Sequence, residues 1–199
     1  MPTFTSRDPS APEFWSERFE QEFMPWDLGD VPAAFRQFVA QTAKPYVTLI
    51  PGCGTGYEVA CLSEAGWDVT AIDFSVAAVD VARKALGRWA DRVVQADFFD
   101  FVPPNPVELI YERAFFCALP PSMRPAVVAR WAELLPPGGL LAGFFFFDDA
   151  PKGPPFGIAA AELDALLTPL FERIADEAVN DSLPIFAGKE RWQIWRRLV

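Results

Sequence analysis

The chain has 199 residues, of which 51% are apolar, and a formal net charge of −10. This length and apolar content favour one globular domain with a substantial core and exclude a disordered chain. The acidic balance, with no cluster of Lys and Arg, disfavours nucleic acid as a substrate, because binding to phosphates requires a basic surface.

The amino-terminal residues lack the basic flank and apolar core of a signal peptide, and no apolar run reaches the roughly 18 residues that span a membrane. Cys53, Cys61 and Cys117 lack metal-ligand spacing, which is typical of reduced thiols. Histidine is absent, so the commonest general base and metal ligand are missing. We expect a cytoplasmic protein that acts as a monomer without a metal or a membrane partner.

The front of the chain predicts two helices joined by a turn. A helical period with aromatic residues on one face covers Pro12 to Phe23 and includes Phe14, Trp15 and Phe19. Trp26 and Asp27 lie in the turn, and a second helix is expected from Pro32 to Thr42. Because this part precedes the first strand, we expect residues 1–43 to form a lid, with a loose terminus over residues 1–11. The alternative is that Trp15 and Trp26 belong to the core.

The next stretch has the pattern of a nucleoside-cofactor half-site. The apolar run from Tyr46 to Ile50 predicts a buried parallel strand, and Gly52, Gly54 and Gly56 follow on alternate positions. Glycine has no Cβ and tolerates positive φ, so a ligand can approach the backbone there. A helix from 57 to 65 and a strand from 68 to 72 complete a βαβ unit.

Asp73 follows the second strand directly, where an acid accepts hydrogen bonds from ribose hydroxyls. A dinucleotide fingerprint reads G-x-G-x-x-G and receives a pyrophosphate, whereas this loop reads G-x-G-x-G and is followed by the bulky Tyr57. The pattern suits a cofactor without phosphate, such as S-adenosylmethionine, and disfavours a dehydrogenase. A tight turn without any ligand is the simpler alternative.

The rest of the chain predicts further strands whose ends carry candidate site residues. Asp97 and Phe98 follow the third strand, 92–96, where a carboxylate and a ring suit the grip of an adenine. Arg113, Phe115 and Phe116 follow the fourth strand, 107–111. The expected later elements are a helix over 123–135, a strand over 140–147, a helix over 159–167, and final strands over 171–177 and 191–198.

With Phe156, which lies in a proline-rich loop after the fifth strand, these residues cluster at the carboxyl ends of the strands. Open parallel sheets bind ligands in the crevice outside those ends. The predicted fold is α/β, a doubly wound sheet of seven strands with helices on both faces.

Several motifs together resemble those of one known family. These are Trp15 with Pro25-Trp26-Asp27-x-Gly29, Ile50-Pro51-Gly52-Cys53-Gly54-Thr55-Gly56, Phe115-Phe116-Cys117-Ala118, Met123-Arg124-Pro125, Leu135-Pro136-Pro137-Gly138-Gly139 and Gly153-Pro154-Pro155-Phe156. They resemble the thiopurine S-methyltransferase family, and within it the halide/thiol methyltransferases. The likeness covers almost the whole chain. Arg113 is the exception, since it matches the thiopurine branch where halide/thiol enzymes have tyrosine.

The resemblance implies a class I methyltransferase in one domain, with the lid at residues 1–43, the Rossmann-like core at 44–199 and an antiparallel last strand. It implies that S-adenosylmethionine is the cofactor. The cofactor contacts it implies fall on Trp15, Trp26, Gly52, Asp73, Asp97, Phe98 and Arg113.

The implied reaction is methyl transfer to a small soft nucleophile, such as a thiol, a halide or a thiopurine-like sulfur. An acceptor that arrives as an anion needs no base, which agrees with the absence of histidine, and a dry aromatic pocket favours the reaction. Candidate pocket residues are Phe14, Phe19, Asp27, Phe115, Phe116 and Phe156. The alternatives are a selenium, tellurium or oxygen acceptor, or an inactive protein that only binds the cofactor.

Overall fold

The computed structural model of the chain describes residues 2–150 and 152–199, and these build one mixed sheet of seven strands. The strand order is β3-β2-β1-β4-β5-β7-β6, with β7 antiparallel to both of its neighbours and the other pairs parallel. The strands are β1 (Val47–Pro51), β2 (Asp68–Asp73), β3 (Val93–Gln95), β4 (Leu109–Arg113), β5 (Leu140–Phe146), β6 (Phe171–Ala178) and β7 (Glu190–Arg197).

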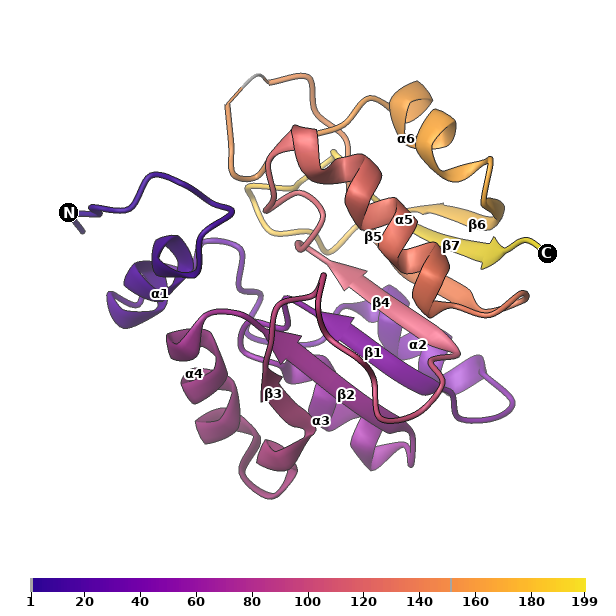
Figure 1. Cartoon of the computed structure of the whole chain (residues 1–199), viewed down its shortest axis with the longest axis horizontal. Coiled ribbons are helices and arrows are strands. Elements are labelled where there is room, and N and C mark those ends of the chain that lie inside the picture. The colour runs from indigo at the N-terminus through magenta and orange to yellow at the C-terminus, as the bar shows by residue number, and fades with distance from the viewer. Residues whose placement is uncertain (1, 151) are drawn as a thin grey trace.

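Helices cover both faces of this sheet (Figure 1). They are α1 (Pro12–Glu20), α2 (Ala33–Gln41), α3 (Tyr57–Glu64), α4 (Val76–Leu86), α5 (Arg124–Leu134) and α6 (Ala160–Leu167), with short 3₁₀ helices η1 (Gly87–Arg92) and η2 (Pro121–Met123). The helices α2, α3 and α4 pack on one face, while α5 and α6 pack on the other. The seven-stranded α/β fold expected from the sequence is therefore confirmed.

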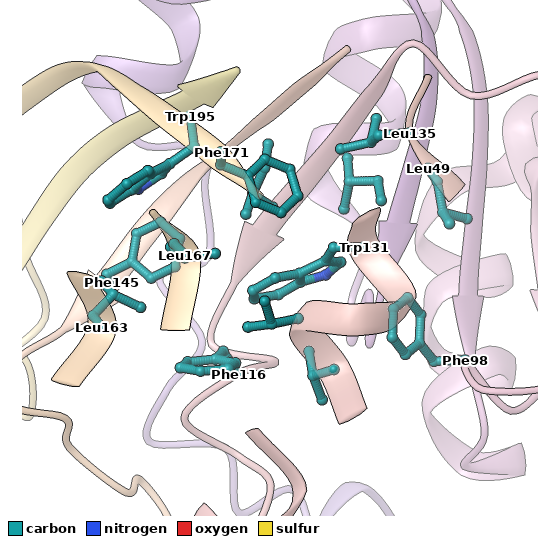
Figure 2. Packing of buried hydrophobic residues seen from close by; sticks show 14 of the residues in the cluster. Leu49, Phe98, Phe116, Trp131, Leu135, Phe145, Leu163, Leu167, Phe171 and Trp195 are labelled. Carbon is teal, nitrogen blue, oxygen red and sulfur yellow. The ribbon is translucent and has the colours of Figure 1, made fainter. Parts of the chain in front are cut away.

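Trp131 of α5 lies at the centre of the core on the α5/α6 face (Figure 2). Its ring packs against Phe116, with centroids 5.2 Å apart, and contacts Phe145 of β5 edge-on. Leu163 and Leu167 of α6 complete the cluster and are fully buried. The single apolar stripe on each helix explains this arrangement, because it must be buried against the sheet.

The opposite core includes α2. Phe35 of α2 is fully buried, and its ring centroid lies 4.1 Å from that of Tyr111 in β4. The ring of Phe35 also contacts that of Trp192 in β7, with their centroids 6.3 Å apart. This helix therefore forms part of the layer that covers the sheet, whereas the sequence analysis assigned it to the lid.

The crevice of the fold lies where β1 and β4 are adjacent, since the chain runs from β1 outward to β3 and then returns to begin β4. Such a switch point opens a space at the carboxyl ends of the strands. Figure 1 shows α1 beyond those ends, and its contacts are with α4. The front of the chain thus overhangs the crevice.

Most of the expected element bounds lie within one residue of the observed ones, and three expectations differ by more. The first helix ends at Glu20 instead of Phe23, because Glu22 adopts a positive φ of 51° and terminates it. The fourth strand is displaced to Leu109–Arg113, because Arg113 still pairs with Phe144 of β5. Residue 1 of the terminus expected to be loose lies outside the described residues, and the part over 2–11 is folded back onto α1, where Glu17 accepts hydrogen bonds from the backbone N–H groups of Thr5 and Ser6. None of the helices in residues 2–150 and 152–199 is long and apolar enough to cross a bilayer.

Candidate functional site

A cavity of about 490 Å³ opens at the carboxyl ends of the strands. Its lining comes from the loop after β1, the ends of β2, β3 and β4, the segment around α1, and the connector between β6 and β7. A volume of this size is typical of small-molecule and cofactor sites.

The glycine loop brings bare backbone to the cavity. Gly52, Gly54 and Gly56 all have φ between 52° and 74°, the left-handed region that favours glycine. A Cβ on Gly52 would lie 2.6 Å from the ring of Phe115, so a side chain at this position would also collide with the opposite wall. Gly52 is therefore required both for the conformation of this loop and for its close approach to the loop after β4.

Asp73 ends β2 beside this loop with only 7% of its surface exposed. One carboxylate oxygen accepts from the backbone N–H of Gly54 at 3.2 Å, and the other accepts from Ser75 at 2.9 Å. Burial raises the pKa of Asp73 to about 6, although these two hydrogen bonds lower it. Each oxygen can accept a further bond, so the carboxylate fits a ligand that offers two hydroxyl groups.

A second buried network lies at the end of β4. Tyr111 donates from its hydroxyl to Glu58 of α3 at 3.1 Å, and Arg113 pairs with the same carboxylate at 4.0 Å. Burial raises the pKa of Glu58. Arg113 also lies over the ring of Phe144, 5.0 Å from its centroid. The contact with Glu58 and the ring of Phe144 together hold the guanidinium of Arg113 in place.

Aromatic rings from the front of the chain form one wall. Trp15 and Trp26 contact each other edge-on with centroids 5.4 Å apart, and Phe14 and Phe19 pack beside them at 4.9 and 6.1 Å. The indole N–H of Trp15 donates to the carbonyl of Pro9. The wall therefore offers ring faces and edges to the cavity rather than this donor.

Two hydrogen bonds fasten this wall to the core. Asp27 accepts from the hydroxyl of Thr55 in the glycine loop at 2.8 Å and from its own turn at Gly29 at 2.7 Å. Ser16 of α1 hydrogen-bonds Ser75, the residue that caps α4, at 2.9 Å. One oxygen of Asp27 thus ties the lid to the glycine loop, while the other stabilises its own turn.

The loop after β4 is fixed from below by a buried acid. One oxygen of Glu112 accepts from the backbone N–H groups of Phe115 and Phe116 at 3.0 and 2.8 Å. Its other oxygen has no partner within the described residues. Burial raises the pKa of Glu112 to about 8, with a further contribution from Glu190.

All nine candidate cofactor residues line the cavity: Trp15, Trp26, Gly52, Gly54, Gly56, Asp73, Asp97, Phe98 and Arg113. Of the six candidate pocket residues, Phe14, Phe19, Asp27 and Phe115 line it as well.

Phe116 and Phe156 do not belong to the lining that residues 2–150 and 152–199 define, so these two expectations are corrected. Phe116 is 4% exposed because it packs into the core against Trp131. Phe156 turns onto its own loop, where its ring occupies the space that a side chain on Gly153 would need. Gly153, Pro154 and Pro155 reach the cavity in its place.

Some lining residues had not been identified from the sequence. Glu58 follows the glycine loop on the first turn of α3, so its place beside the loop was a usable signal. Ile185 and Phe186 come from the connector between β6 and β7, and Met123 comes from η2. Met123 begins one of the motifs of the family resemblance, but no local pattern marks any of the three as a cavity residue, because only the tertiary fold brings their segments to the strand ends.

Comparison with known proteins relates this sequence to methyltransferases. The family model of thiopurine S-methyltransferase matches residues 10–197. A relative from Arabidopsis thaliana named probable thiol methyltransferase 2 is 32% identical, over 92% of this chain and 84% of its own. Thiocyanate methyltransferase 1 from the same plant is 29% identical over the same shares.

A solved structure also shares the fold. It is 1,6-didemethyltoxoflavin-N1-methyltransferase from Burkholderia thailandensis with bound 1,6-didemethyltoxoflavin and S-adenosylhomocysteine, with a TM-score of 0.68 at 21% identity, and the match covers 100% of this chain and 94% of that one. The family match spans nearly the whole chain, and the cavity lies at the switch point of the shared fold. The chain therefore belongs to the thiopurine S-methyltransferase family and is an S-adenosylmethionine-dependent methyltransferase.

Proposed function

We propose that this methyltransferase acts on a small soft nucleophile, a thiolate or a halide-like anion, without a base from the enzyme. The observation that carries the proposal is the chemistry of the cavity wall. Much of the wall away from the glycine loop is formed by aromatic and aliphatic side chains such as Phe14, Phe115 and Leu119. The sequence has no histidine, and hydrogen bonds from Gly29 and Thr55 hold Asp27 in a structural contact between the lid turn and the glycine loop.

The proposed cofactor contacts follow from the same geometry. Asp73 would accept from the ribose hydroxyls with its remaining lone pairs, and the open backbone of Gly52 and Gly54 would lie along the cofactor. Asp97 and Phe98, at the end of β3, would hold the base. Trp15, Trp26 and Arg113, with Gly56 at the start of α3, would complete the site.

Bound S-adenosylmethionine supplies a methyl group on a positively charged sulfur. The task of this chain is to hold an acceptor in line behind that methyl group and to exclude water from it. Positioning of two reactants can provide about 7–11 kcal/mol of the barrier reduction. The faces of Trp15, Trp26 and Phe19 would favour the positive sulfur by about 0.5–2 kcal/mol each.

The names of the relatives support an acceptor of this class, since they are thiol and thiocyanate methyltransferases. The finer assignments remain proposals as well: a single domain with a lid at the front, a monomer, a small molecule rather than nucleic acid as acceptor, and a cytoplasmic location. The excess of acidic over basic residues supports a small molecule rather than nucleic acid as acceptor. The three free cysteines support a cytoplasmic location.

A pair of pH–rate profiles tests the reaction. We expect the purified enzyme to methylate both iodide and thiophenol. The rate with thiophenol should rise with pH toward the pKa of the thiol, whereas iodide has no proton to lose and its rate should stay nearly flat.

Asp27→Asn is the matched variant, since it keeps the size of the side chain but removes the only carboxylate of the lid turn that reaches the glycine loop. It should keep both profiles. An acid limb shared by both acceptors and lost in Asp27→Asn would refute the base-free reaction. Failure of iodide, bisulfide and thiols alike, with turnover of selenium or oxygen acceptors, would refute the acceptor class.

A further inference from the structure

Five acidic and three basic side chains line the cavity, and nearly all of them have a partner. Asp73 and Asp97 accept hydrogen bonds from backbone N–H groups. Asp27 accepts hydrogen bonds from Gly29 and Thr55, and Asp30 forms an ion pair with Arg36. Glu58 pairs with Arg113. The exceptions are Arg7 and Arg18, neither of which forms an ion pair with any residue of the described chain.

Arg18 is held in place without forming a salt bridge with any described residue. Its guanidinium lies between two rings, 3.2 Å from the centroid of Phe14 and 4.3 Å from that of Phe4, and it donates to the carbonyl of Phe14 at 2.5 Å. Rings and a carbonyl fix the position of a cation but leave its net charge in place. The neighbouring Glu17 accepts instead from the backbone of Thr5 and Ser6.

Those same hydrogen bonds place Arg7. Because Thr5 and Ser6 are tied to Glu17, the next residue is held at the edge of the cavity, where Arg7 is exposed and contributes to the lining. Two cations that form no ion pair within the described residues therefore lie on the lid side, whereas Asp73 and Asp97 lie at the ends of β2 and β3.

This placement matters because the chain as a whole carries a net charge of −10 and repels anions. A local cationic patch at the mouth of a cavity with low-dielectric walls can reverse that effect and raise the local concentration of anions. We propose that Arg7 and Arg18 form the entrance for the methyl acceptor and select acceptors that carry negative charge. The inference rests on the proposed function and assigns residues to its specificity.

The test uses three thiols that differ in the charge of the tail: 3-mercaptopropionate, 2-mercaptoethanol and cysteamine. Each kcat/KM is expressed per thiolate, so that differences in thiol acidity cancel. We expect wild type to favour 3-mercaptopropionate over cysteamine by about tenfold, the lower end of the range for electrostatic focusing, with a ratio that falls as potassium acetate is added.

The double variant Arg7→Gln/Arg18→Gln should bring this ratio close to one while the affinity for S-adenosylhomocysteine, measured by calorimetry, stays unchanged. Arg7→Lys/Arg18→Lys keeps the charge and should keep the ratio, which separates charge from packing against the rings. Arg88→Gln is the matched control, because Arg88 is exposed, pairs with Glu64 and lies outside the lining.

A preference that is the same in wild type and in Arg7→Gln/Arg18→Gln would overturn the entrance and leave the proposed function intact. Absence of methyl transfer from wild type to all three thiols would refute the proposed function and the entrance with it. Loss of the preference in the lysine variant as well as in the glutamine variant would also overturn the role of charge.

Discussion

The ionisation of Asp73 should control the affinity for the cofactor. In the free protein burial raises the pKa of this carboxyl to about 6 from a usual value of 3.8. The raised pKa means that the fold favours the protonated form: the stability it contributes is complete below about pH 4 and lost as pH rises through about 6. Ribose hydroxyls donate to the ionised form, so a bound cofactor favours the opposite state.

The magnitude follows from the fraction of Asp73 that is ionised. At about pH 5, one unit below its pKa, roughly one molecule in eleven carries the charge. The affinity for S-adenosylhomocysteine should therefore fall about tenfold, or about 1.4 kcal/mol, between about pH 7.5 and about pH 5. Binding in the lower range should release up to one proton.

Titration calorimetry at several pH values, in buffers that differ in ionisation enthalpy, measures both the affinity and the released proton. Asp73→Asn should bind about 10–100-fold more weakly near neutral pH, since a hydrogen bond to a charged group contributes about 1.5–3 kcal/mol, and its affinity should not vary with pH. Asp68→Asn is the matched control at the other end of β2, where Asp68 pairs with Arg92.

Equal affinity of wild type at both pH values would refute the reasoning. A pH dependence that survives in Asp73→Asn would assign the titration to another group. Glu58 is the other lining carboxyl whose pKa burial raises.

Two further predictions concern the loop after β4 and the lid. Because the pKa of Glu112 is raised from 4.5 to about 8, its contribution to stability should be complete below about pH 4.5 and lost as pH rises through about 8. The Tm of wild type should therefore fall between about pH 6 and pH 9, and Glu112→Gln should flatten that decline. Parallel declines of the two proteins would show that Glu112 does not titrate in this range. S-adenosylhomocysteine should slow tryptic cleavage after Arg18 but not after Arg36, because α1 overhangs the cavity while α2 packs on the sheet. Equal cleavage rates at Arg18 with and without S-adenosylhomocysteine would mean that the lid does not respond to the cofactor.

The sequence alone determined the βαβ unit and the acid that follows it. Gly52, Gly54 and Gly56 need positive φ, and the spacing to Asp73 is set by one helix and one strand, so the information is local. The start of α4 (Val76–Leu86) is specified locally as well, because Ser75 caps it by accepting from the backbone N–H of Ala78. Parallel strands end at one edge of the sheet, which is why residues distant in sequence could be placed together at the crevice.

Tertiary structure decided which aromatic side chains reach that crevice. Phe115 and Phe116 are adjacent and chemically alike, yet one lines the cavity and the other fills the core against Trp131, because Glu112 fixes the turn between them. The pairing of the lid with the glycine loop, through Asp27 and Thr55, joins residues 28 positions apart that no periodicity connects. Local patterns specify where the chain turns, whereas the direction in which a side chain points depends on the surfaces that the folded chain packs around it.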